Sequence, residues 1–491
     1  MANPLKQLAG ETAIYGLSSI LARVVNFLLV PLYTRVLVDS DYGVVTEFLS
    51  YIAVLQVALA LGLETGCFKF AQREEGNPEK VFSNALAIVS LVCLAFFAVL
   101  AVFSGRLASV MGYEGFGKVI IYVGAILTFD TLTAILFARL RFQHKALKFA
   151  VVRTLKIFTE LGVNLLLYLC LPRYLAGHDG SFITSFVSAT PDFTYAIFAI
   201  FVSCIVCFLM LLPDLLKVGF EFDGKLWKAL LVYSLPLMVA GLPGVMNDFM
   251  DRILMRFFDI GHVDPQLWRA NLGVYQAGVK IAVIMSLFVQ MFRYAAEPFF
   301  FQRQKDKDST QLYGKVMTYF VAFCMAGFLF VTLYLDEIGL LIGRDFRAGL
   351  SITPIMLMAY VLLGMQFNIS MWYKLSGKTG YAVWITLAGL VVTLVINIVF
   401  MPKYSYTAAA WAHIASYLVM MAISLWLGNK YYPIPYEWRR IAMMILIALV
   451  IYFISMKLPQ MSFWADFGIH TLLLLAYVVP VTWYLYKKRN S

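Results

Sequence analysis

The stretch GETAIYGLSSILARVVNFLLVPLYTRVL, residues 10–37, contains a run from Thr12 to Tyr33 that carries a single charged residue, Arg23. The hydrocarbon core of a bilayer is about 30 Å thick, and a helix needs about 20 mostly apolar residues to cross it. Runs of this kind recur along the whole chain, and 62% of its 491 residues are hydrophobic. The sequence therefore predicts an all-α polytopic membrane protein.

We expect about fourteen transmembrane helices, because each apolar run of about 20 residues can form one span. Lys and Arg gather in connections on one side of the predicted membrane, as in residues 139–141, 303–307 and 487–489. Cytoplasmic loops are rich in these residues, so both termini are predicted to be cytoplasmic. The same rule accounts for the net charge of +11 without nucleic acid as a partner. The spans are predicted at about 12–35, 42–67, 82–104, 118–138, 150–172, 193–213, 228–252, 271–298, 313–335, 351–373, 379–401, 405–428, 439–457 and 466–486.

A weak internal repeat divides these spans into two lobes. The sequence Tyr-Gly-Val at residues 42–44 opens the second span, and Leu-Gly-Val-Tyr at residues 272–275 opens the eighth. Arg23 and Arg252 stand at nearly the same spacing before these two motifs. Parallel repeats are related by an axis along the membrane normal, and the substrate site lies between them. The predicted parts are an N-terminal lobe (1–213), a C-terminal lobe (214–430) and an extra helix pair (431–491).

Cationic side chains inside the predicted spans indicate where an anion would bind. A charge at membrane depth costs several kcal/mol unless it is paired or wetted. Arg23 and Lys280 have no acidic residue three or four positions away, where a helical neighbour would stand. Arg252 and Arg293 each have one, so local ion pairing remains an alternative for these two. The predicted substrate-binding residues are Arg23, Arg252, Lys280 and Arg293.

Acidic residues within or near the spans are candidates for ion pairs or for coupling transport to an ion. Lys156 stands four residues before Glu160, which predicts a local pair. Glu64, Asp130 and Asp251 are candidate partners across helices for Arg23 and Lys280, as the alternative to an anionic ligand. The pattern predicts no catalytic residue, metal ligand or cofactor, because the chain has no nucleophile elbow, Gly-rich phosphate loop or His/Glu metal spacing. The predicted coupling or ion-pairing residues are Glu64, Asp248, Asp251 and Glu297.

Three stretches resemble a known family. AIYGLSSILARVVNFLLVPLYTRVLVDSDYGVV (13–45) is similar to the opening of polysaccharide-export flippases, the Wzx-like branch of the MOP (multidrug/oligosaccharidyl-lipid/polysaccharide) superfamily. YSLPLMVAGLPGVMNDFMDRILMRFF (233–258) has the Leu-Pro-Leu entry and the Asp-Arg pair of that family, at Asp251 and Arg252. GVYQAGVKIAVIMSLFVQMFRYAAEPFFF (273–301) ends in a similar Pro-Phe.

The resemblance implies an inner-membrane transporter whose two lobes surround a cationic cavity. Such proteins move an undecaprenyl-diphosphate-linked oligosaccharide, a repeat unit of O-antigen, capsule or exopolysaccharide, to the periplasmic leaflet by alternating access. The resemblance matches Arg23 and Arg252 with cavity cations, and Lys280 and Arg293 are extrapolations from it. The implied partners are the lipid-linked glycan, membrane lipids, and glycan polymerase and export machinery.

Other functions stay open at this point. Fourteen spans, rather than twelve, resemble the lipid II flippase, whose extra helix pair shapes a groove for the lipid tail. A drug/cation antiporter of the same superfamily would need a dominant acidic site. A membrane glycosyltransferase, polymerase or ligase usually has a long outer loop with catalytic acids or arginines. The longest predicted outer loop offers only His178, Asp179 and Asp192, so we expect a transporter and not an enzyme.

Overall fold

The computed structural model describes residues 4–73, 77–176, 190–219, 221–304, 306, 308–459 and 462–489. Within these ranges the regular structure is helical throughout, without strands. His178 and Asp179 of the predicted outer loop lie outside the described residues. Among the residues searched, 13 helical segments are long and apolar enough to cross a membrane. Together with α1 (Pro4–Val36) they overlap every predicted span, so the prediction of a polytopic all-α protein is confirmed.

By its contacts the chain divides into two compact units. Unit 1 comprises Met1–Phe257 with Gly261–Gly273, and unit 2 comprises Phe258–Ile260 with Val274–Ser491. The long helix α11 (Pro265–Arg303) therefore begins in unit 1 and continues in unit 2. The boundaries of the predicted lobes, at 213 and 430, stay predictions.

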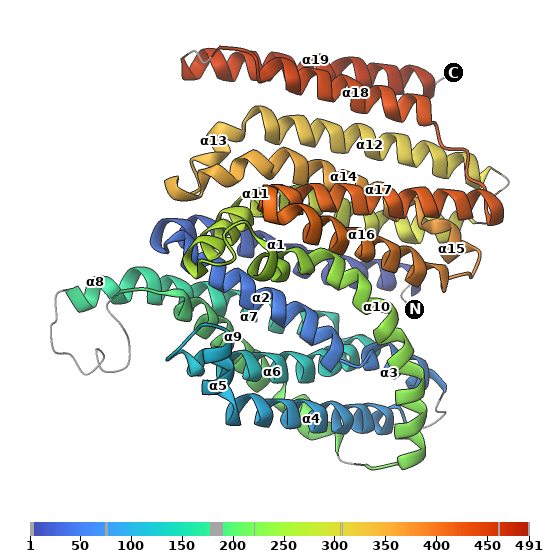
Figure 1. The fold of residues 1–491 in the computed structure, drawn as a ribbon. Helices are drawn as coiled ribbons and strands as arrows, with labels where there is room; N and C mark the ends of the chain where they lie inside the picture. Colours follow the sequence, from blue (N-terminus) through green and yellow to red (C-terminus); the bar gives the residue numbers. More distant parts are fainter. Residues whose placement is uncertain are drawn as a thin grey trace. The chain divides into compact units, whose positions relative to one another are not determined.

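In unit 1, α4, α6 and α9 pack on one another and α1 packs along α7 (Figure 1). Asn77 caps α4 by accepting a hydrogen bond from the Lys80 main-chain N–H at 3.2 Å, and Pro78 fills the first turn. The helices after α1 are α2 (Asp39–Leu59), α3 (Leu63–Arg73), α4 (Pro78–Val102), α5 (Ser104–Val110), α6 (Gly117–Phe142), α7 (Ala146–Leu165), the π-helical turn η1 (Leu166–Cys170), α8 (Leu171–Ala176), α9 (Phe193–Val218) and α10 (Gly224–Phe258).

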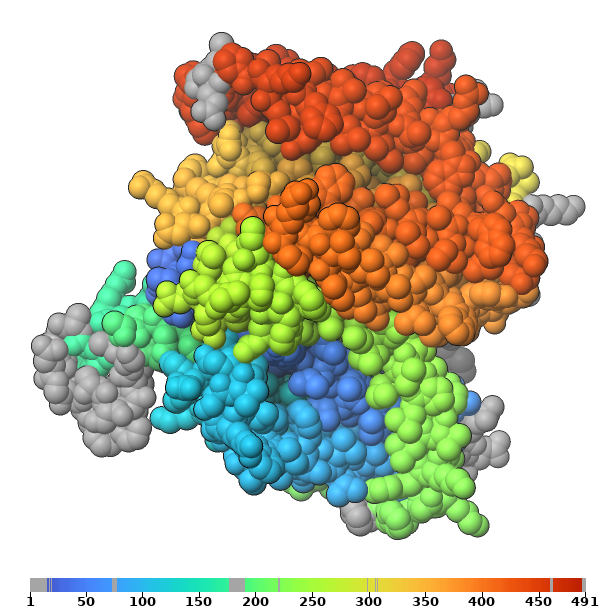
Figure 2. Space-filling model, viewed as in Figure 1, coloured from blue at the N-terminus to red at the C-terminus, as the bar shows by residue number. Residues whose placement is uncertain are grey.

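In unit 2, α16 packs on α17, α14 packs on α17, and α12 packs on α18. The pair formed by α18 and α19 lies beside α12, and Figure 2 shows the side chains of this pair as a continuous strip along one edge of unit 2. The helices after α11 are α12 (Ser309–Leu333), α13 (Leu335–Gly339), the 3-10 helix η3 (Arg344–Ile352), α14 (Thr353–Ile369), α15 (Met371–Leu375), α16 (Tyr381–Tyr404), α17 (Tyr406–Tyr431), α18 (Trp438–Ser455) and α19 (Phe463–Arg489).

The glycines of the two repeat motifs allow the main chains of α2 and α11 to touch within unit 1. A Cβ on Gly43 would lie 1.9 Å from the Arg269 carbonyl oxygen, and a Cβ on Gly273 would lie 2.1 Å from the Asp39 carbonyl oxygen. Each glycine thus meets the carbonyl four residues before the other glycine. Small residues let membrane helices approach closely, so the two motifs lie where α2 and α11 cross. That the motifs belong to an internal repeat stays a prediction.

Candidate functional site

Arg23 is exposed on α1, one turn away from the exposed Asn26. The opposite side of the helix is anchored, because Val25 and Leu29 are buried and the Tyr33 hydroxyl donates to Asn164 Oδ1 of α7 at 2.8 Å. Arg23 makes no ion pair or hydrogen bond with any residue that the structure describes. Its position is therefore set by the packing of α1, while its five N–H donors stay available to a ligand.

Arg252 is buried on α10 and is already paired. Its guanidinium lies 3.2 Å from Asp251 Oδ1, and it donates to the main-chain carbonyl of Asp248 one turn earlier. The ring of Phe249 lies 5.2 Å from the guanidinium carbon. The sequence predicted a local pair with the Asp248 carboxylate as the alternative to substrate binding. The adjacent Asp251, which is fully buried, forms an ion pair that the spacing did not indicate.

Arg293 and Glu297 form the predicted local pair on α11, at 3.6 Å between Nε and Oε2. Glu297 also accepts a hydrogen bond from Lys374 Nζ of α15 at 2.7 Å, which the sequence did not indicate. The ring of Phe367 lies 4.7 Å from the Arg293 guanidinium carbon. One carboxylate therefore serves two cations here, and the group keeps a net positive charge.

Lys280 is half-buried on α11, within unit 2. The four predicted cations are thus divided between the two units: Arg23 and Arg252 belong to unit 1, and Lys280 and Arg293 belong to unit 2. Their joint role in one substrate site stays a prediction.

The ion pair predicted between Lys156 and Glu160 is wrong. Lys156 Nζ of α7 instead lies 2.5 Å from Asp130 Oδ1 of α6, and the Cys204 thiol of α9 lies 3.2 Å from the same oxygen. The packing of α6 and α7 brings this carboxylate within reach, so the pair crosses helices. Glu64, a predicted coupling or ion-pairing residue, pairs with Arg141 of α6.

A buried acid in α2, Glu47, was not singled out from the sequence. Its side chain is 0% exposed, and Arg256 of α10 donates to its Oε1 at 2.6 Å. Tyr51 donates to the same oxygen at 3.1 Å, and Tyr113 donates to the other carboxylate oxygen. Both oxygens of Glu47 are therefore hydrogen-bonded. The available signal was an acid within an apolar span, four residues before a tyrosine.

A second arginine, Arg269, and the rings of Tyr113 and Trp268 lie next to this acid. The Arg269 guanidinium carbon lies 4.3 Å from the centroid of the Tyr113 ring and 5.3 Å from that of Trp268, and Arg269 donates to the Gly112 carbonyl at 3.0 Å. Burial raises the pKa of the Tyr113 phenol above its usual value, and the charge of Glu47 raises it further. Tyr113 therefore stays a protonated donor. We call Glu47, Tyr51, Tyr113 and Arg256 the Glu47 cluster.

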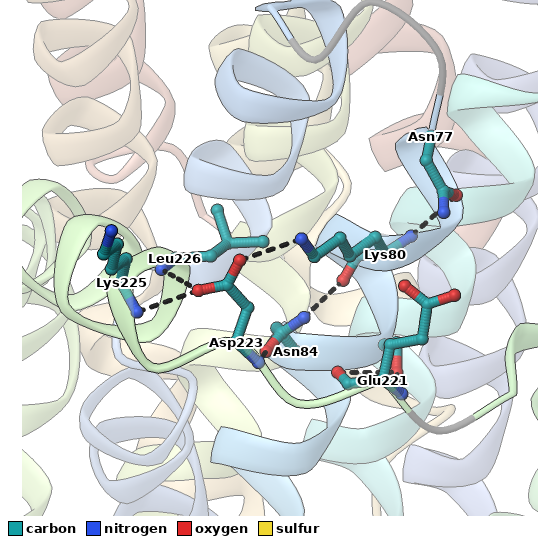
Figure 3. Close-up of polar contacts among 8 residues, drawn as sticks. Asn77, Lys80, Asn84, Glu221, Asp223, Lys225 and Leu226 are labelled. Atoms are coloured by element: carbon teal, nitrogen blue, oxygen red, sulfur yellow. Dashed lines mark hydrogen bonds and ion pairs between the residues drawn. The ribbon is translucent and has the colours of Figure 1, made fainter.

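The connection between α9 and α10 is held against the start of α4 (Figure 3). Lys80 Nζ lies 2.8 Å from Asp223 Oδ2, and Asn84 Oδ1 accepts from the Asp223 main-chain N–H at 2.9 Å. The Asp223 carboxylate also accepts from the main-chain N–H groups of Lys225 and Leu226 and so caps α10. The hydrogen bond from Lys80 is the main reason why the pKa of Asp223 falls to about 2.

Solved structures with the same fold are membrane transporters. The lipid II flippase MurJ in an inward closed conformation is 14% identical, with a TM-score of 0.74 over 97% of this chain and 99% of that chain. An inward-facing multidrug resistance MATE transporter of the MOP superfamily is 13% identical, with a TM-score of 0.62 over 85% of this chain and 94% of that chain. A MOP superfamily transporter from Pyrococcus furiosus is 12% identical, with a TM-score of 0.56 over 86% of this chain and 96% of that chain.

These likenesses show that the chain has the fold of MOP superfamily transporters, which confirms the fold that the resemblance implied. A search of curated proteins finds no significant match. Residues 8–304 match the family described as polysaccharide biosynthesis protein. This match covers more than half of the chain and includes α1 with Arg23 and α10 with Arg252. The chain is therefore a polytopic membrane protein that belongs to the polysaccharide biosynthesis protein family.

Proposed function

We propose that the protein is a flippase that moves a polyprenyl-diphosphate-linked oligosaccharide across the bacterial cytoplasmic membrane. In this proposal both termini are cytoplasmic, and residues 1–213 and 214–430 form the two lobes that alternate around the substrate. The substrate crosses without covalent change. Membership in the polysaccharide biosynthesis family and the fold of MOP transporters support this substrate class and this mode of action.

The observation that carries the proposal is the exposed position of Arg23 without a partner among the described residues. An unpaired cation at membrane depth costs several kcal/mol, so a chain that keeps one needs a ligand or water there. The planar guanidinium binds two phosphate oxygens at once, which suits a diphosphate better than a lysine would. Arg23 is therefore the proposed contact for the substrate diphosphate.

The other predicted cations differ in how much charge they can offer. Arg252 is neutralised by the buried Asp251, whereas Arg293 and Lys374 share a single carboxylate. We therefore propose Arg23 as the principal contact and Lys280 and Arg293 as contributors of positive potential. Arg252 then maintains the local structure of α10 and adds less to binding.

The proposed cycle follows from this distribution of charge. The diphosphate enters from the cytoplasmic side, the polyprenyl tail stays in the lipid, and rocking of the lobes exposes the headgroup outside. The two states must bind the headgroup with different affinity for this to work. An inside-negative membrane potential itself favours outward movement of an anion, by about 2.3 kcal/mol per charge per 100 mV.

A lipid II flippase is the second candidate, and one observation favours it. The likeness to MurJ extends over 97% of this chain and therefore includes at least part of the α18–α19 pair, whereas the likeness to the MATE transporter covers 85%. Both candidates carry a polyprenyl diphosphate, so they share the proposed role of Arg23. They differ in the glycan, and for a surface glycan we propose polymerase and export machinery as further partners.

Depletion of the protein in its native cell, followed by mass spectrometry of lipid-linked glycans, tests this proposal. We expect a polyprenyl-diphosphate oligosaccharide to accumulate, and a wild-type copy to clear it. Accumulation of lipid II would instead assign the second candidate. A copy with Arg23→Ala should fail to clear the intermediate, while a copy with the exposed Arg106→Ala, a matched loss of a cation, should succeed. If no such lipid accumulates in a cell without a second flippase gene, the proposal is wrong.

A further inference from the structure

Unit 2 contains a cavity of about 700 Å³ between α12 and the pair formed by α18 and α19. Its walls come from residues 312–326 of α12, the beginning of α18 and the end of α19. All three segments lie at the same end of these helices, where the sequence predicts the cytoplasmic side. None of the predicted substrate residues lines the cavity. We call it the α12–α19 pocket.

The mouth of this pocket is cationic. Lys315 lines it, is exposed, and makes no ion pair or hydrogen bond with any described residue. Arg440 also lines it and pairs with Glu437, which accepts a second hydrogen bond from Thr318 at 2.9 Å. The pair of Arg440 and Glu437 is neutral as a whole, so Lys315 gives the lining a net positive charge.

Exposed tyrosine and tryptophan side chains lie at or near the mouth of the pocket. Tyr319 is 45% exposed and Tyr486 is 65% exposed, and both line the pocket. Trp438 stands beside Glu437 at the start of α18 and is also exposed. Tyrosine and tryptophan are enriched where the membrane meets water. The mouth therefore lies at the depth of lipid headgroups.

The deeper wall of the pocket is apolar. Phe323 and Ala326 continue α12 away from the mouth, and Val478 and Val481 face them from α19. Phe323 is 59% exposed and lines the part of the pocket that lipid hydrocarbon would fill in a membrane. The pocket thus changes from cationic to aromatic to apolar along the helices, which is the order of polarity in a phospholipid from its phosphate to its acyl chains.

We propose that the α12–α19 pocket binds an anionic glycerophospholipid of the surrounding leaflet. Its phosphate lies at Lys315 and Arg440, and one acyl chain lies along Phe323 and Val478. Basic pockets between transmembrane helices on the cytoplasmic side bind anionic lipid headgroups in this manner. The lipid fills the space between α12 and the α18–α19 pair and so adds to the direct packing of the pair on α12. The proposal does not depend on the proposed transport function.

Photocrosslinking tests this site in the full-length protein. A benzoylphenylalanine replaces Phe323, and the protein is reconstituted in vesicles of equal amounts of phosphatidylcholine and phosphatidylglycerol. The control position is Phe453, an exposed aromatic residue near the other end of α18. After irradiation, mass spectrometry gives the ratio of the two lipid adducts. One unpaired cation predicts about a fivefold excess of phosphatidylglycerol at position 323, and no excess at position 453.

Three substitutions test the charge at the mouth and the apolar wall separately. Lys315→Gln in the crosslinking protein should return the adduct ratio to that of the vesicle, while Lys457→Gln, which removes an exposed cation near the far end of α18, should leave it unchanged. Ala326→Trp fills the apolar wall and should reduce all adducts at position 323. An equal adduct ratio at positions 323 and 453, or a ratio that survives Lys315→Gln, would overturn the proposal. So would complete displacement of phosphatidylglycerol by a small amount of undecaprenyl phosphate, because the pocket would then select the polyprenyl carrier.

Discussion

Arg23 and Arg256 of the Glu47 cluster are both arginines in an apolar chain, but their surroundings differ: Arg256 has a buried acidic partner and Arg23 has none among the described residues. Arg256 of the Glu47 cluster meets a fully buried carboxylate at 2.6 Å, and that carboxylate has two further tyrosine donors. Arg23 is exposed and has no partner among the described residues. The first arrangement satisfies every charge and fixes α2 to α10. The second leaves a cation unsatisfied, which is useful only where an anionic ligand arrives.

The largest effect on stability should come from breaking the Glu47 cluster. Glu47→Gln leaves Arg256 without its counter-charge in a buried site, so we expect a loss of about 3–5 kcal/mol in the free energy of unfolding. Thermal unfolding of the purified protein in detergent measures this. Glu114→Gln is the matched control, because Glu114 is an exposed acid next to Tyr113 and should leave the melting temperature unchanged. A melting temperature of Glu47→Gln within one degree or so of wild type would show that the cluster is not a structural ion pair.

The pair of Lys156 and Asp130 provides an intermediate case, because both side chains are partly exposed, at 22% and 16%. Lys156→Met alone should cost about 2 kcal/mol, less than breaking a fully buried pair, since it strands the Asp130 carboxylate. The double variant with Asp130→Leu removes both charges and should recover most of the loss. Chemical unfolding of the three proteins checks this order. A double variant less stable than Lys156→Met would mean that Asp130 has a second role.

The smallest effect should appear at the exposed connection between α9 and α10. The pKa of Asp223 is lowered from 3.8 to about 2, so its contribution is complete above the unfolded value and disappears as the pH falls through about 2. The difference in melting temperature between wild type and Asp223→Asn should therefore be small at pH 6 and shrink between pH 4 and pH 2 (roughly the interval between the two pKa values). A difference that grows in that interval would contradict the ion pair with Lys80.

Every predicted span overlaps a helix of the structure, and 13 of these helices are long and apolar enough to cross a membrane. Hydropathy is a local property that the fold does not override. The two motifs that indicate a repeat meet in the structure at Gly43 and Gly273, while the repeat itself stays a prediction. The pair of Arg293 and Glu297 was predictable because helical spacing alone brings the two side chains together.

Ion pairs that depend on packing could not be predicted in this way. Lys156 pairs with Asp130 on another helix although Glu160 stands at the favourable helical spacing. Glu47 meets residues 113 and 256, which are remote from it in sequence. Arg252 also donates to the main-chain carbonyl of Asp248 one turn earlier, a contact that the spacing of side chains does not predict.

The central claim is that Arg23 serves the substrate and not the fold. We would measure flipping of a fluorescent polyprenyl-diphosphate glycan in proteoliposomes that contain wild type, Arg23→Lys or Arg23→Ala. Loss of two charge-assisted hydrogen bonds should slow Arg23→Ala by roughly a hundredfold, with Arg23→Lys between the two and all three melting temperatures equal. Wild-type flipping by Arg23→Ala would contradict the account, and so would a drop in melting temperature large enough to place Arg23 with the structural pairs.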